Sequence, residues 1–85
     1  MPVVLLRAPL SELAGAREID LEGGTVKEAL VALEDSYPAI SGWVLDERRT
    51  IRRHVNVYVN GELAQEDSEV GAADRIHVLP AITGG

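Results

Sequence analysis

The side chains that could do chemistry in this sequence are few and scattered. The two histidines, His54 and His77, are far apart in the chain, and each lies next to the apolar positions of a strand-like segment. Two isolated imidazoles form neither a metal site nor a catalytic triad, so we interpret both as surface residues of strands. The chain has no cysteine, which excludes disulfides, thiolate metal sites and cysteine nucleophiles.

Two further segments contain residue types that are common in active sites, but neither has the required context. Gly23 and Gly24 lack the spacing and the lysine of a phosphate-binding loop, so we expect a turn before a helix. Asp46 and Glu47 are adjacent carboxylates in the arginine-rich segment DERRTIRR, which favours a solvated loop. We therefore expect no catalytic residue, no metal and no bound cofactor, and we predict that the chain is not an enzyme by itself.

The C-terminus is the most informative segment. The sequence LPAITGG ends on two glycines directly after a predicted strand, and composition alone would allow a frayed tail without function. A terminal carboxylate on a thin tail can, however, be delivered into a narrow channel of a partner, because glycine has no Cβ and adopts backbone angles that other residues disfavour. From Pro80 to Gly85 such a tail reaches about 17 Å. In this interpretation Ile82, Thr83 and Gly84 pass through the channel and Gly85 carries the reacting group.

The charge balance is acidic, with 8 Lys and Arg residues against 14 Asp and Glu residues and a net charge of −6. Nucleic-acid-binding proteins usually have a basic footprint, so we expect no nucleic-acid partner. The acidity favours either solubility alone or a protein partner with a positive docking face. Because no apolar run is long enough for a membrane span or a signal peptide, we expect a cytoplasmic protein without membrane contact, monomeric when free.

Half of the basic residues gather in one short segment, as Arg48, Arg49, Arg52 and Arg53. Three interpretations stay open: a solvated loop, a docking contact for an acidic partner, and a nucleic-acid contact. The last is disfavoured because no aromatic residue lies among these arginines.

The elements that would position the tail begin with a hairpin and a helix. Residues 3–8 are apolar on both faces, which predicts a central strand, residues 9–16 predict a turn, and the alternating segment REIDL predicts a second strand. Capping-box spacing and helical periodicity predict a helix over residues 25–36, which ends before Pro38. Its apolar stripe comprises Val26, Ala29, Leu30, Leu33 and Tyr37, and we place Lys27, Glu28, Glu34 and Asp35 off that stripe.

The second half of the chain predicts three more strands. Residues 39–53 are mixed, with a short helical turn at the core edge around Ile40, Trp43, Val44 and Leu45. The segment HVNVYVN alternates as a strand does, Asn60-Gly61 is a strong hairpin signal, and residues 62–65 form a brief return strand. A turn at residues 71–74 leads into the last strand, RIHVLP. We expect Leu30, Leu33, Val55, Val57 and Ile76 in the core, and Tyr58, His77 and Leu79 on the exposed face as a docking patch.

The resulting element order, β-β-α-β-β-β, predicts an α+β fold. The first and last strands are both apolar enough to be central. Placing them side by side in parallel closes one mixed sheet over the helix, which is the β-grasp (ubiquitin-like) architecture. We expect this domain to span residues 1–80 and a flexible tail to span residues 81–85.

The residues that support this fold also resemble a known family. The helix TVKEALVALEDSYP, the strand and turn VNVYVNG and the tail LPAITGG together resemble the ThiS/MoaD sulfur-carrier family over the whole chain. The segments HVNVYVN and LPAITGG are most similar to the carrier used in cysteine biosynthesis by actinobacteria. One departure occurs before the last strand. Where the family often has Asp-Gly-Asp, only Asp74 is kept, which we expect to alter turn geometry rather than tail chemistry.

The resemblance implies a mechanism. An E1-like activating enzyme of the ThiF/MoeB type would adenylate the Gly85 carboxylate with ATP, a cosubstrate of that partner, and a sulfur source would then displace AMP to leave a thiocarboxylate. This product would donate sulfur to a biosynthetic acceptor enzyme, such as one that makes cysteine. The alternatives are the small subunit of molybdopterin synthase, a ubiquitin-like modifier that is joined to lysines through Gly85, and a β-grasp interaction module with an inert tail.

Overall fold

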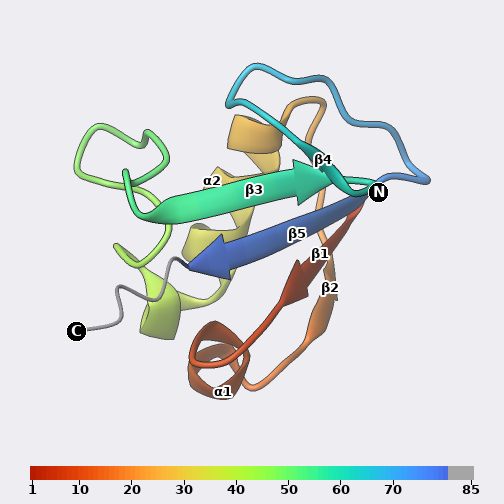
Figure 1. Ribbon diagram of the computed structural model, residues 1–85. Coiled ribbons are helices and arrows are strands. Elements are labelled where there is room, and N and C mark those ends of the chain that lie inside the picture. The colour runs from red at the N-terminus through yellow and green to blue at the C-terminus, as the bar shows by residue number, and fades with distance from the viewer. Residues whose placement is uncertain (81–85) are drawn as a thin grey trace.

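The computed structural model describes residues 1–80 and shows a single mixed sheet packed on one main helix (Figure 1). The sheet has five strands in the order β2-β1-β5-β3-β4. The parallel pair β1–β5 lies at its centre, and all other neighbours are antiparallel. The elements in chain order are β1 (Val3–Leu6), α1 (Leu10–Ala14), β2 (Glu18–Asp20), α2 (Val26–Ser36), the 3₁₀ helix η1 (Pro38–Ile40), β3 (Val55–Val59), β4 (Glu62–Leu63) and β5 (Arg75–Pro80).

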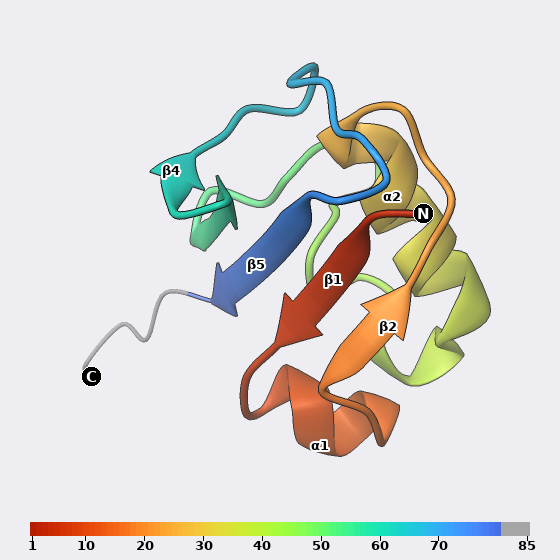
Figure 2. The ribbon, with the colours of Figure 1, turned by 90° about the vertical axis from the view of Figure 1, so that its right-hand side faces the viewer.

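This topology is the β-grasp fold, so the predicted α+β class and the parallel pairing of the first and last strands are confirmed. The helix α2 covers one face of the sheet and leaves the other face open (Figure 2). The five predicted core residues, Leu30, Leu33, Val55, Val57 and Ile76, all lie buried between the two layers.

The segment predicted as a turn at residues 9–16 is instead built around a short helix, α1, and the first strand is shorter than predicted. Pro9 adopts helical angles and its carbonyl accepts from Leu13, while Leu10 is fully buried and anchors the helix to the core. Gly15 ends the helix with a positive φ of 76°. Pro9 and Gly15, which predict a turn from sequence, are therefore the N-cap and C-cap residues of a helix.

The main helix begins as its capping box predicts. The Thr25 hydroxyl accepts from the Glu28 N–H, and the Glu28 carboxylate reaches back to the Gly24 N–H at 2.7 Å. Gly23 is required by a close approach, because a Cβ there would lie 2.7 Å from the backbone nitrogen of Ala29. The helix ends at Ser36, before Pro38, in agreement with the predicted range.

One expectation about this helix is wrong. Glu34, placed off the apolar stripe, is buried with 5% of its surface exposed. Its Oε2 atom accepts from the N–H groups of Val44 and Leu45, both at 2.9 Å. The carboxylate therefore satisfies two buried amides of the segment that crosses the end of the helix, a partnership that helical spacing does not reveal.

The segment between η1 and β3 is ordered by short-range bonds. The Asp46 carboxylate accepts from the N–H groups of Arg48 and Thr50 and from the Thr50 hydroxyl. Val44 and Leu45 are buried as predicted, but Trp43 is 46% exposed, which corrects its placement against the core. Within residues 1–80, no helix is long and apolar enough to cross a membrane.

Candidate functional site: the end of β5 and the open sheet face

The predicted attachment group, Gly85, and the tail residues Ile82, Thr83 and Gly84 lie outside the described residues. The structure does show how the tail begins. The last strand, β5, is flanked by β1 on one side and by β3 on the other, and its final residue, Pro80, pairs with Val55. Residues Arg75–Val78 are paired on both sides, and Leu79 and Pro80 continue the pairing with β3 alone. The starting point of the C-terminal tail is therefore defined by the centre of the domain rather than by a loose edge.

The outer face of the sheet next to this point carries one continuous row of side chains. Leu5 on β1 pairs with His77 on β5, His77 lies opposite Tyr58 on β3, and Tyr58 lies opposite Leu63 on β4. Glu18 on β2 completes the row at the other sheet edge, opposite Leu5. Directly opposite side chains on one face are in contact range, so the row crosses the whole sheet.

The three residues predicted as a docking patch, Tyr58, His77 and Leu79, come together on this face. With Gly61 they line a small, largely apolar hollow. All three are half-buried rather than fully exposed, because neighbouring strands cover part of each side chain. Leu79 lies one row closer to the tail, opposite Asn56.

Two apolar members of the row, Leu5 and Leu63, were missed in the sequence. Leu63 is 68% exposed, the most exposed large apolar side chain of the described residues. Leu5 belongs to the strand predicted as central because it is apolar on both faces, and in the structure this residue is half-buried on the open face of the sheet. The position of Leu63 on this face could have been predicted from the sequence, because it lies in the return strand after Asn60-Gly61. A two-residue turn at these positions pairs residue 59 with 62 and residue 58 with 63, so Leu63 must lie opposite Tyr58.

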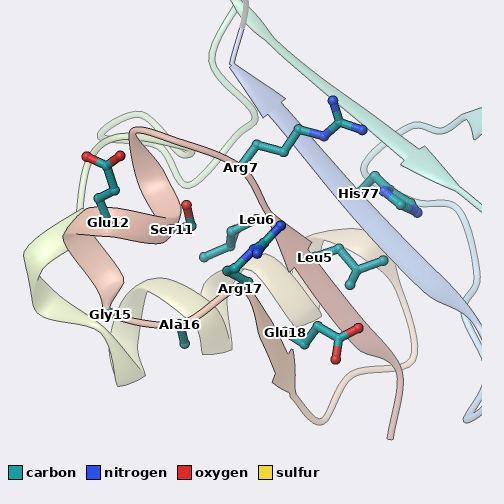
Figure 3. A pocket seen from close by; sticks show the side chains of 10 residues that line it. All are labelled: Leu5, Leu6, Arg7, Ser11, Glu12, Gly15, Ala16, Arg17, Glu18 and His77. Atoms are coloured by element: carbon teal, nitrogen blue, oxygen red, sulfur yellow. The ribbon is translucent and has the colours of Figure 1, made fainter.

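A second hollow opens beside the row, between the ends of β1 and β5 and the helix α1 (Figure 3). Arg7 and Arg17 stand at it on either side of the chain that leaves β1, with His77 on the far side. Figure 3 shows the Arg7 side chain extending from the end of β1 toward β5. The hollow is therefore lined by two cations, Arg7 and Arg17, and by two carboxylates, Glu12 and Glu18, at the end of the sheet from which the tail starts.

The turns at the opposite end of the sheet are fastened by a carboxylate and an amide. Asp74 accepts from the Gly71 N–H at 2.7 Å and from the Asn60 side-chain amide at 2.8 Å, and both bonds hold the pKa of its carboxyl below the ordinary value. The single acid kept from the family's Asp-Gly-Asp pattern therefore closes the turn before β5.

No catalytic or metal-binding arrangement appears among the residues the structure describes. His54 is exposed just before β3, and His77 lies within the apolar row. In the described part of the chain, no group of three or more His, Asp or Glu residues is placed to hold a metal ion.

Comparison with known proteins identifies the family. The chain matches the ThiS family over residues 4–85, which includes the terminal glycines. It belongs to the ThiS family. Proteins that resemble it are small ubiquitin-like carriers and modifiers.

Three relatives illustrate this range. Small archaeal modifier protein 1 of Haloferax volcanii is 36% identical over 83 residues, covering 94% of this chain and 95% of that protein. The crystal structure of the Amycolatopsis orientalis BexX/CysO complex contains a chain that aligns with a TM-score of 0.86 and 28% identity, covering 100% of both chains. The crystal structure of Mycobacterium tuberculosis CysO aligns with a TM-score of 0.83 and 25% identity, covering 96% of this ThiS-family chain and 100% of that one.

Proposed function

We propose that this ThiS-family protein is a sulfur carrier whose C-terminal carboxylate, on Gly85, is activated by an E1-like adenylating enzyme and converted to a thiocarboxylate. The observation that carries the proposal is the family match that runs through the final Gly84-Gly85, on a chain whose last strand is the central strand of the sheet. The similarity to CysO supports sulfur donation in cysteine biosynthesis or in the synthesis of another sulfur-containing metabolite.

The chemistry requires two steps on the partner enzyme. A Gly85 carboxylate oxygen attacks the α-phosphorus of ATP, pyrophosphate leaves, and an acyl-adenylate forms. A sulfide donor then attacks the acyl carbon, AMP leaves with the bonding electron pair, and the thiocarboxylate remains. The carboxylate itself is a poor electrophile, which is why the adenylate is needed. The partner supplies phosphate binding and charge stabilisation, and this chain supplies the acyl group and its position.

The apolar row Leu5–His77–Tyr58–Leu63 and the adjoining Leu79 are the surface we assign to partner docking. An exposed apolar patch beside a functional chain end is typical of an interaction site. Because β5 carries both His77 and the start of the tail, a partner that holds this face also determines where the tail enters. This arrangement would convert docking energy into placement of the reacting carboxylate.

The test is intact-mass analysis after incubation with the E1-like enzyme of the same organism, ATP and sulfide. We expect a mass gain that corresponds to the replacement of one oxygen by sulfur. A chain that lacks Gly84 and Gly85 is the matched control and should stay unmodified. If the full chain also stays unmodified while the enzyme adenylates its other substrates, the proposal is wrong.

A second candidate function is protein modification, favoured by the 36% identity to a small archaeal modifier protein. It uses the same activated Gly85, but a lysine amine rather than sulfide attacks the acyl carbon. Arg75 is the last Lys or Arg of the chain, so trypsin would leave the ten-residue remnant Ile76–Gly85 on each modified lysine. Detection of that remnant on cellular proteins would establish modification. Co-purification with a large pterin-binding subunit would instead indicate the small-subunit role in molybdopterin synthesis.

A further inference from the structure

The net charge of the molecule is confined to one end. Residues 20–29 and 60–75 contain eight acidic and two basic residues, which accounts for the whole net charge of −6, and the rest of the chain is neutral. The two segments adjoin in space, since the Val26 and Lys27 N–H groups donate to the carbonyls of Ser68 and Glu66. In Figure 1 they lie at the end of the sheet opposite to the C-terminal end of β5.

The other end of the sheet gathers arginines around the start of the tail. Arg7 follows β1, whose Leu6 pairs with Val78 on β5. The carbonyl of Arg17, just before β2, accepts from the Leu6 N–H at 2.8 Å. On the other side of β5, Arg53 lies two residues before Val55, the partner of Pro80. Backbone pairing thus places cations on both sides of the strand from which the tail begins.

Some arginines at this end have structural partners and others have none within residues 1–80. Arg49 pairs with Asp35 at 3.1 Å, and the Arg52 Nε donates to the Gly42 carbonyl, so both fasten the segment before β3. The remaining four are exposed, and no hydrogen bond or ion pair to another described residue engages their guanidinium groups: Arg7, Arg17, Arg48 and Arg53. Three of them, Arg7, Arg17 and Arg53, lie beside β5 by the backbone pairing given above, and we call these three the tail-root arginines.

We propose that the tail-root arginines bind acidic side chains that surround the channel in which a partner protein receives the C-terminal tail. The inference rests on the proposed function and adds the charge of the partner's surface to it. An acidic surface attracts the exposed arginines and repels the acidic far end, while the rest of the chain is neutral overall, so the molecule meets an acidic partner tail first. A nucleic acid fits less well, because the overall charge is −6 and no aromatic side chain lies among residues 46–53.

A first experiment tests the surface without the enzyme. Hexaglutamate is titrated into ¹⁵N-labelled protein at low salt, and we expect backbone amide shifts at and beside the tail-root arginines. Hexalysine is the matched probe and should shift residues of 20–29 and 60–75 instead. Absence of hexaglutamate shifts near Arg7 and Arg53 would overturn the inference. So would a short oligothymidine that binds the same residues more tightly than hexaglutamate does, because it would point to nucleic acid.

A second experiment measures the consequence for activation by ATP–pyrophosphate exchange with the E1-like enzyme. The double variant Arg7→Gln/Arg53→Gln and the single variant Lys27→Glu have the same net charge, but the changes lie at opposite ends. We expect the double variant to raise the KM for the carrier about tenfold with little change in kcat, and to flatten its dependence on salt. Lys27→Glu should leave KM and kcat unchanged.

Equal effects of the two variants would mean that only the total charge matters, which contradicts the inference. A wild-type chain that supports no exchange at all would contradict the proposed function instead. In that case the hexaglutamate titration still decides whether the tail-root arginines form an acid-binding surface.

Discussion

The side chains of Asn60 and Asp74 are joined by a 2.8 Å hydrogen bond, although the two residues are 14 positions apart in the chain. Asn60 also accepts from the Arg75 N–H through its side-chain oxygen, and its own N–H donates to the Arg75 carbonyl. The hairpin turn after β3 is therefore fastened to the first residue of β5. The strand that leads to the tail is aligned at its beginning by a turn of the neighbouring strand.

Substitution of Asn60 should separate the two roles of this residue. Its φ of 53° lies in the left-handed region, which asparagine tolerates better than alanine does. Asn60→Ala loses the side-chain hydrogen bonds as well, so it should lower the free energy of unfolding by about 1–3 kcal/mol. Asn60→Gly keeps the backbone conformation and should cost less. Urea unfolding of both variants measures the difference. Equal losses would mean that the left-handed conformation contributes nothing.

Two aspartates should give the protein an acid-sensitive part of its stability. The Thr50 hydroxyl and N–H, with further help from the Arg48 N–H and the Arg52 charge, lower the pKa of Asp46, and the bonds from Gly71 and Asn60 lower that of Asp74. A carboxyl whose folded pKa is lowered stabilises the fold at pH values above its unfolded pKa, here 3.8, and this stabilisation is lost as pH falls through the lowered folded value.

The melting temperature of the double variant Asp46→Asn/Asp74→Asn should therefore depend less on pH in this acidic range than that of the wild type. Thermal melts between neutral pH and pH values below 3.8 measure it. The variant Glu47→Gln/Glu62→Gln replaces two exposed acids that have no side-chain hydrogen bond to another described residue, so it is the matched control and should follow the wild type. A double aspartate variant as acid-sensitive as wild type would contradict the assignment.

Glu34 should be the most sensitive charged residue of the fold. Glu34→Ala leaves the buried N–H groups of Val44 and Leu45 without an acceptor, and we expect a loss of about 2–5 kcal/mol in the free energy of unfolding. Glu34→Gln retains an acceptor oxygen and should lose less. Exposed Asp35, the next residue, offers the control Asp35→Ala. If denaturant unfolding shows a larger loss of stability for Asp35→Ala than for Glu34→Ala, the two buried hydrogen bonds are unimportant for the fold.

Substitutions on the open sheet face should affect a partner rather than folding. Leu63→Ala removes a side chain that is 68% exposed, and its effect on stability should stay within about 0.5 kcal/mol. If the apolar row docks the activating enzyme, Leu63→Ala and His77→Ala should raise the KM for the carrier in pyrophosphate exchange. Ser36→Ala, on the end of α2 and away from this face, should not. Unchanged KM values for both row variants would remove the row from the docking surface.

The tail should be essential for activation and dispensable for folding. Gly84 and Gly85 come after the last strand of the sheet, so deletion of Gly85, or of both glycines, should leave the melting temperature unchanged. The same deletions should abolish pyrophosphate exchange, because the new carboxylate falls short of the phosphate by about 3.5 Å for each residue removed. Gly84→Ala keeps the length and should give intermediate rates. Wild-type exchange by the double deletion would falsify the carrier function.

The parts of this protein that sequence reasoning predicted correctly are those with a local or periodic cause. The capping box at Thr25 and Glu28, the stripe along α2 and the alternation of β3 each follow from the geometry of a single element. The Asn60-Gly61 pair predicted its hairpin because the turn itself requires positive φ angles, which both residues adopt. The parallel pairing of β1 and β5 followed because both strands are apolar enough to be central.

Only the tertiary structure decided the features that depend on distant partners. Residues 9–16 contain proline, serine and glycine, which favour a turn, yet the burial of Leu10 against the core supports a helix there. Glu34 has the spacing of a surface residue, and only the segment crossing the helix end supplies the two amides that hold it. Likewise, the sequence determined a net charge of −6, but the folding of residues 20–29 against 60–75 decided that this charge lies away from the tail. The periodicity of a sequence reports on one helix or strand at a time. Hydrogen bonds such as those of Glu34, and the distribution of charge over the surface, depend instead on which elements pack together.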